Sequence, residues 1–418
     1  MLDRSPFKIR SQAALKAIYL LKGRLKPGLA PPPAIFDGIE IAPFPNDAPA
    51  AVCISADFEL SWAWRRHPQE ISQMRGRQGR CNLPIILEIL RVHSVPITWA
   101  TVGHLFLQSC RCGADGRPHP EMPRPLVNRL WEGDWYRHDP CTDWENHPEW
   151  YAPDLIEQIV QDPIPHEIGS HSFSHIDYSA DCSSDELVRA EMERCLQVME
   201  EHRLKPRTLI YPFNRMGHHY LGLLSEYSLT SVRHRDPRVM LSYPEPTEQG
   251  IYKLYESLHI HSARRYDCCS KAQVFLQEAV RRNALLHLWF HPSDPTPLFR
   301  NEFRRIVEHL AQQREQGRVW IATMEQLAAY CEARRSLRVE VQREHRRLRL
   351  FLRGNFDRQR YGEADLTLLI PHPTLPRQMF RTEIGQSRML HPPEPSRRRD
   401  GQRLGQVPTA TESVELEF

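Results

Sequence analysis

The stretch HEIGSHSFSH, residues 166 to 175, contains the pattern from which the fold and chemistry of this chain are inferred. Two histidines, His171 and His175, follow a short apolar run and lie four residues apart. If they begin a helical turn, this spacing places both imidazoles on one face, which is the geometry that a divalent metal needs from neighbouring ligands. A metal site needs more than two ligands, so the pattern predicts a carboxylate ligand from another part of the chain.

The composition is that of a soluble globular protein. The 418 residues exceed one compact domain, and with 40% hydrophobic and 26% charged residues the chain can bury a sizeable core. The formal net charge of +3 is too small to indicate a surface that binds nucleic acid, and we expect no nucleic-acid partner. No segment is long enough to span a bilayer. The basic N-terminal segment around residues 15–21 leaves contact with the inner membrane face open.

The ten cysteines are scattered and include no CxxC pair. Neither a zinc ribbon nor a small disulfide scaffold is indicated. We therefore expect a cytoplasmic protein with reduced thiols.

Short apolar runs alternate with amphipathic helical patterns along most of the chain. Strand followed by helix, many times over, implies a parallel sheet and predicts an α/β fold, a distorted (β/α) barrel of about seven strands. A long insertion rich in Trp, Pro, Asp and His interrupts the alternation. The predicted division is a proline-rich leader over 1–48, the barrel over 49–335 with its insertion at 103–150, a small β-rich appendage over 336–384, and a disordered tail over 385–418.

Polar clusters follow four of the predicted strands. They are ISADFELSW, EIGSHSFSH, LIYPFNRMG and LLHLWFHPSD. In barrels of this kind, catalytic groups lie at the C-terminal ends of the strands. One such cluster would more often be a helix cap, but four at successive strand ends indicate an active site.

This order of motifs resembles the NodB-type polysaccharide deacetylases, carbohydrate esterase family 4, over residues 50–330. HSFSH matches the family's H-[ST]-x-x-H motif without alteration, and the chain is most similar to a branch with a long aromatic insertion and an HLW-x-HP ending. The resemblance implies that His171 and His175 bind the metal, that Asp57 is the catalytic base, and that His291 is the acid.

Two positions depart from the family pattern. The acidic motif usually has adjacent aspartates, whereas Phe58 here separates Asp57 from Glu59. Residues two apart in a strand face the same side, so Glu59 is the preferred third ligand, with Asp57 as the alternative. The YPFNRMG motif lacks an arginine at the expected place, which leaves Arg215, or alternatively Arg207, to hold the catalytic carboxylate.

These residue types predict a hydrolytic reaction. Two neutral imidazoles and one carboxylate leave open positions on a Zn²⁺-like ion, with Co, Mn or Ni as alternatives. Such an ion lowers the pKa of a bound water from near 16 toward roughly 7, and this water would attack an acyl carbonyl. Asp57 would take its proton, and His291 would protonate the amine leaving group. His287 is the rejected alternative to His291 because it lies within the apolar run.

The substrate is predicted from the insertion and from the third polar cluster, LIYPFNRMG. Aromatic rings pack on sugar rings while polar side chains bond the hydroxyl groups. The predicted substrate-binding residues are Trp135, Tyr136, Asp139, Trp150, Tyr151, Pro212, Phe213 and Asn214.

The sequence therefore predicts a metal-dependent hydrolase that removes an N-acetyl or similar acyl group from an amino sugar or glycan. Two alternatives stay open: an amidase or deformylase acting on a non-carbohydrate C–N bond, and a glycan-binding protein with a decayed site. The sequence leaves open whether the substrate is a polymer, a lipid-linked precursor or a nucleotide sugar, and it leaves open the oligomeric state.

Overall fold

A computed structural model of the chain describes residues 28–261, 267–344 and 347–370, with residues 11 and 14 and the short strands at 378–380, 406–408 and 413–417. The basic segment around residues 15–21 lies outside this part of the chain. Among the described residues, no helix combines the length and apolarity needed to cross a membrane.

The centre of the fold is a curled parallel sheet, as predicted. Its β3 strand, AVCISADF, is buried along its whole length because helices cover one face of the sheet and the barrel interior the other. Seven parallel strands pair in the order β11-β3-β4-β5-β6-β7-β9. Their bounds are β3 Ala51–Phe58, β4 Thr98–Thr101, β5 Glu167–Ser170, β6 Thr208–Ile210, β7 Ser231–His234, β9 Tyr252–Tyr255 and β11 Leu285–Phe290. Three short strands extend the sheet: β8 Glu245–Pro246, β10 Leu258–His259 and β12 Trp320–Ile321. The predicted distorted barrel of about seven strands is confirmed.

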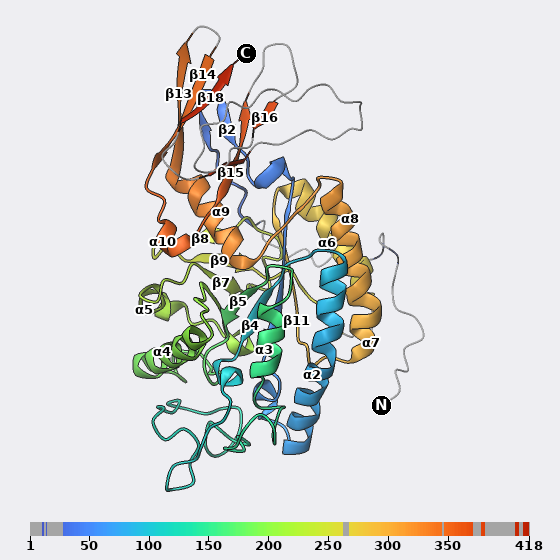
Figure 1. Ribbon diagram of the computed structural model, residues 1–418, viewed down its shortest axis with the longest axis vertical. Helices are drawn as coiled ribbons and strands as arrows, with labels where there is room; N and C mark the ends of the chain where they lie inside the picture. The colour runs from blue at the N-terminus through green and yellow to red at the C-terminus, as the bar shows by residue number, and fades with distance from the viewer. Residues whose placement is uncertain are drawn as a thin grey trace.

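Amphipathic helices connect the strands and lie outside the sheet (Figure 1). The apolar residues of most of these helices join one core cluster with strand residues such as Val52, Ile54 and Ala56, whereas those of α9 join a second cluster with the leader and the appendage. The longer helices are α2 Gln69–Val92, α3 Pro153–Val160, α4 Asp185–Glu201, α6 Cys268–Arg282, α8 Arg304–Glu315 and α9 Met324–Ser336. The shorter ones are α5 Leu221–Ser225, α7 Thr296–Leu298 and α10 Arg358–Tyr361, with single turns η1 Pro45–Asp47, η2 Trp62–Trp64, η3 Gly103–Phe106, η4 Pro212–Asn214, η5 His218–Tyr220 and η6 Phe299–Phe303.

The leader and the C-terminal appendage share a sheet. Strand β2 of the leader pairs with β15 of the appendage, with Ile41 opposite Leu368. This sheet contains β1 Ile35–Phe36, β2 Ile39–Ile41, β15 Asp365–Ile370, β16 Gln378–Phe380 and β17 Gln406–Pro408. A second antiparallel sheet contains β13 Leu337–Glu344, β14 Arg347–Gly354 and β18 Ser413–Glu417. The prediction of a disordered tail after 385 is wrong for β17 and β18, because both pair with appendage strands.

The insertion lies at the opposite end of the molecule from β13 and β14 (Figure 1). Between residues 107 and 152, all of them described, the chain forms no helix and no strand. A disulfide joins Cys112 to Cys141 within it. The expectation of reduced thiols is therefore wrong for this pair, and a cytoplasmic location stays a prediction.

A buried carboxyl group lies at the start of β5. Thr98 Oγ1 donates to Glu167 Oε2 over 2.7 Å, and the backbone N–H of Glu325 donates to the same oxygen over 3.1 Å. Burial, reinforced by the charge of Glu325, raises the pKa of Glu167 to about 8. Because this pKa is higher in the folded than in the unfolded chain, the contribution to stability is complete at low pH and is lost as the pH rises through the folded value.

We predict that Glu167→Gln flattens the pH dependence of stability. The free energy of unfolding of the wild-type protein should fall by on the order of 2–4 kcal/mol between about pH 5 and pH 8, and the amide should remove most of that fall because it does not ionise. Urea unfolding at several pH values measures the effect. Glu157→Gln, on the exposed face of α3, is the control. Parallel pH profiles for wild type and Glu167→Gln would contradict the assignment.

Candidate active site

Three side chains predicted as metal ligands converge at the C-terminal ends of the strands. Glu59 follows β3, and its Oε2 lies 3.2 Å from His171 Nε2 and 2.9 Å from His175 Nε2. All three side chains are buried. Their ligand atoms lie within 4.8 Å of one another, which is the spacing of donors around a single ion.

The HSFSH segment is a loop and not a helical turn. Ser172 and His175 adopt left-handed backbone conformations with φ of 59° and 57°, so the expectation that helical spacing stacks the imidazoles is wrong. The loop is fixed by its own hydrogen bonds, since Ser172 Oγ accepts from the backbone N–H of Ile176 over 3.0 Å. The two rings still come together, with centroids 4.9 Å apart.

The protonation of the imidazoles suits metal binding. His171 Nδ1 lies 2.7 Å from the carbonyl oxygen of Ile210, which can only accept, so Nδ1 donates to it and Nε2 is the nitrogen that faces Glu59. Burial lowers the pKa of His175 to about 4 despite the nearby Glu59 carboxylate, so this ring is neutral at pH 7. Two imidazoles and a carboxylate form a donor set that fits Zn²⁺ or a similar divalent ion.

Asp57 is held by a different arginine from the one predicted. Arg233, on β7, donates from Nη1 to Asp57 Oδ1 over 2.6 Å and from Nη2 to Oδ2 over 2.7 Å, and both side chains are buried. Arg215 instead pairs with Asp177, and Arg207 lies near Glu325. The assignment of Arg215 to the catalytic carboxylate is therefore wrong.

His291 lies near the carboxylates of both Glu59 and Asp57. It follows β11, and its Nε2 is 3.5 Å from Glu59 Oε1 and 3.9 Å from Asp57 Oδ2. Burial alone would lower the pKa of His291, but the charges of Glu59, Asp57 and Asp294 raise it above its usual value. The side chain is 24% exposed, so solvent and substrate can reach it. His287 is buried within β11, with its Nε2 2.9 Å from Ser55 Oγ.

The η4 loop lies beside the predicted ligands. Phe213 packs its ring on His175, with centroids 4.3 Å apart, and Asn214 Oδ1 accepts from Arg233 Nη2 over 3.0 Å. Phe213 and Asn214 have positive φ angles of 58° and 52°. Pro212 is buried and starts the turn. The structure therefore places this motif at the site, and its role in substrate binding stays a prediction.

The insertion residues that were predicted to bind substrate do not line the candidate active site. Their side chains pack in the core beneath the insertion and offer no open surface to a sugar. They are Trp135, Tyr136, Asp139, Trp150 and Tyr151. The prediction fails because a long segment without helices or strands must bury its own aromatic residues to become ordered.

Two residues at the site escaped the sequence analysis. Arg233 occurs in the run SVRH, and its signal is a charged residue inside an otherwise apolar strand. Trp64, in η2, donates from Nε1 to Ser293 Oγ over 3.3 Å and so connects the segments that follow β3 and β11. Trp64 is half-buried, and no spacing in the sequence distinguishes it from Trp62, which is fully buried.

Comparisons with known proteins agree with this architecture. Residues 62–232 match the family model for polysaccharide deacetylase. A solved structure of a protein from Mycobacterium smegmatis, assigned as a polysaccharide deacetylase, aligns with a TM-score of 0.53 at 15% identity and covers 76% of this chain and 99% of that one. A similarly assigned protein from Pseudomonas aeruginosa PAO1 aligns with a TM-score of 0.48 at 14% identity, covering 69% of this chain and 92% of its own. No curated protein matches the sequence.

Proposed function

We propose that this chain is a polysaccharide deacetylase of the NodB type, a hydrolase acting on C–N bonds, which removes an N-acetyl or similar acyl group from an amino sugar or glycan in a metal-dependent reaction. The match of residues 62–232 to the polysaccharide deacetylase family model supports this proposal. The observation that carries the proposal is the convergence of Glu59, His171 and His175 beside Asp57 and His291. One cluster of neighbouring side chains then contains a metal donor set, a base and an acid.

Asp57 is proposed as the base. Burial alone would raise the pKa of its carboxyl group, but the guanidinium of Arg233 holds this pKa below the usual range, so Asp57 is ionised at neutral pH. Its carboxylate can accept a proton from the attacking water. A divalent ion bound by Glu59, His171 and His175 would polarise the acyl carbonyl and acidify that water.

His291 is proposed as the acid. Its raised pKa keeps a larger fraction of the imidazole protonated at neutral pH than an isolated histidine has. An amine leaves only after protonation, and His291 Nε2 lies 3.5 Å from Glu59 Oε1 while its side chain stays partly exposed to solvent. Its proton is therefore assigned to the leaving nitrogen of the substrate.

Two half-buried aromatic rings are the proposed contacts for a sugar. Phe213 lies against His175, and Trp64 is bonded to Ser293, two residues beyond His291. One ring thus lies beside a proposed metal ligand and the other beside the segment that carries His291, where apolar faces of a pyranose ring would pack. The buried Trp and Tyr residues of the insertion are not part of this surface.

The complete donor set disfavours a decayed glycan-binding site, because all three proposed ligands are present and the carbonyl oxygen of Ile210 orients His171. The choice between an amino sugar and another N-acyl substrate is decided by assay. Chitooligosaccharides and cyclic ureides are suitable representatives of the two classes.

We predict that removing the metal abolishes hydrolysis. A bound ion supplies several kcal/mol of transition-state stabilisation, so chelator treatment should lower the rate of acetate release from chitooligosaccharides by about 10³-fold or more. Added Zn²⁺ or Co²⁺ should restore it. His175→Ala should resist this rescue, whereas His219→Ala, at an exposed position of η5, should behave as wild type. Full activity of the stripped protein, with its circular dichroism unchanged, would refute the proposal.

A further inference from the structure

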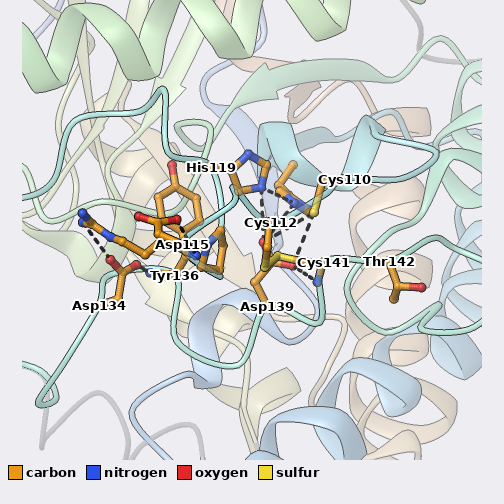
Figure 2. Close-up of a disulfide and its surroundings, with 12 residues drawn as sticks. Cys110, Cys112, Asp115, His119, Asp134, Tyr136, Asp139, Cys141 and Thr142 are labelled. Atoms are coloured by element: carbon orange, nitrogen blue, oxygen red, sulfur yellow. Dashed lines mark hydrogen bonds and ion pairs between the residues drawn. A yellow bond between two sulfur atoms is a disulfide. The ribbon is translucent and has the colours of Figure 1, made fainter.

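A second group of metal-type side chains lies in the insertion, apart from the candidate active site. We call His104, Cys110, His119 and Asp139 the insertion cluster. Their ligand atoms all lie within 4.8 Å of one another. Figure 2 shows His119, Cys110 and Asp139 pointing toward one another beside the disulfide between Cys112 and Cys141.

The distances within the cluster are those between the corners of one coordination shell. His104 Nε2 and His119 Nε2 lie 3.0 Å apart, and Asp139 Oδ2 lies 3.4 Å and 3.2 Å from them, respectively. Cys110 Sγ is 3.8 Å from the same oxygen. In a tetrahedral zinc site with Zn–N and Zn–O near 2.0–2.1 Å and Zn–S near 2.3 Å, neighbouring N or O donors are about 3.3 Å apart and S and O donors about 3.5 Å.

The hydrogen bonds of the two imidazoles turn one nitrogen of each ring outward and leave the other facing the cluster. His104 Nδ1 lies 3.3 Å from the carbonyl oxygen of Trp150, and His119 Nδ1 lies 3.3 Å from Glu121 Oε1. Both oxygens can only accept, so Nδ1 is the donor of each ring. The two Nε2 atoms and Asp139 Oδ2 therefore face one another in a buried space, and these are the atoms that an ion would bind.

The surroundings orient the remaining donors. Asp139 Oδ1 accepts from the backbone N–H of Cys141 over 3.0 Å, which directs Oδ2 toward the imidazoles. Tyr151 OH lies 3.1 Å from Cys110 Sγ. Trp62 covers His104, with ring centroids 4.3 Å apart, and Tyr136 covers His119 at 4.8 Å. Outer hydrogen bonds and a shell that excludes water are general features of bound metal ions.

From this convergence we propose that the insertion cluster binds one divalent ion of the zinc type through two imidazoles, a thiolate and a carboxylate. Nitrogen and sulfur donors favour zinc over magnesium or calcium, and four protein ligands leave no open position for a substrate. The site is therefore structural. Binding to the thiolate releases the Cys110 proton to solvent, and no other bond is made or broken.

The ion would link the insertion to the HSFSH loop that carries His171 and His175. His104 belongs to η3, whose backbone N–H groups reach that loop: Gly103 donates to the carbonyl oxygen of Ser172 over 2.8 Å and His104 to that of Phe173 over 2.9 Å. The other three ligands come from the irregular part of the insertion, which forms no helix or strand over residues 107–152. The ion would therefore help to hold in place a segment that has no helix or strand to order it.

Cobalt(II) spectroscopy tests the proposal independently of the catalytic function. The active-site donors are nitrogen and oxygen only, so a thiolate-to-cobalt charge-transfer band in the near ultraviolet reports the insertion cluster alone. We expect this band when Co²⁺ is added, without reductant, to metal-free Glu59→Gln protein, and we expect it to saturate at one equivalent per chain. Its absence from folded protein would overturn the proposal even if deacetylation were metal-dependent.

Two cysteine variants identify the thiolate. Cys110→Ser should remove the band and should bind one equivalent of zinc fewer than its Glu59→Gln parent. Cys81→Ser, at an exposed position of α2, should change neither. A band that survives Cys110→Ser would overturn the assignment, as would equal zinc content in the two proteins. If Cys110→Ser does not fold, the spectrum of the Glu59→Gln protein still decides.

Discussion

Replacement of Arg233 by methionine is expected to lower the free energy of unfolding by about 3–5 kcal/mol, because it leaves the carboxylate of Asp57 buried without its cation. The two hydrogen bonds from Arg233 are short, and both partners are shielded from water. The ring of Trp289 lies 4.4 Å from the guanidinium carbon and would lose its cation as well. Urea unfolding of the two proteins at pH 7 measures this loss.

Catalysis should change in a way that lost stability alone does not produce. Arg233 lowers the pKa of Asp57, so its removal raises that pKa and should move the acidic limb of the kcat/KM profile to higher pH. The double variant Arg233→Met/Asp57→Asn should regain stability, because the unpaired charge is gone, and should stay inactive. Arg215→Met is the matched control, since a partly exposed pair with Asp177 is worth about 1 kcal/mol or less. An unshifted pH profile in Arg233→Met would contradict the claim that Arg233 lowers the pKa of Asp57 in the working enzyme.

Glu59→Gln and Asp57→Asn should both inactivate the protein, but for different reasons. Glu59 faces both histidines, so Glu59→Gln should lose one equivalent of bound metal per chain and about 10³-fold in kcat/KM. Asp57 faces Arg233, so Asp57→Asn should keep the metal content of the wild type and lose about 10²- to 10⁴-fold in kcat. Elemental analysis together with acetate release separates the two effects.

The opposite pattern would reverse the roles of the two acids. If Asp57→Asn lost the metal and Glu59→Gln kept it, Asp57 would be the third ligand. Phe58 between them is buried and faces the opposite side of β3, which is why two acids separated by one residue can still reach one pocket.

The sequence predicted the elements whose signals are local. The alternation of apolar runs and helical patterns predicts the barrel, and the polar ends of those runs predict where Glu59, His171 and His291 meet. The choice of His291 over His287 also follows from position, because one lies beyond the strand and the other within it.

Long-range pairing was not predictable in the same way. Nothing near Arg233 in the sequence indicates that it reaches Asp57, some 170 residues earlier, because that contact depends on how β7 curls toward β3. The prediction that the aromatic residues of the insertion bind substrate failed for a related reason. A tryptophan suits a sugar-binding face and a small core equally well, and only the packing of Trp135 and Trp150 distinguishes the two. The cysteine count likewise gave no hint of the bond between Cys112 and Cys141.

The pairing of β2 with β15 has a consequence for biosynthesis. Ile41 and Leu368 occupy neighbouring strands although almost the whole polypeptide separates them. While the nascent chain emerges, Ile41 lacks its neighbour in β15 until Leu368 has been added. Such distant closure slows folding. This edge of β2 should therefore stay accessible to chaperones until β15 has been synthesised.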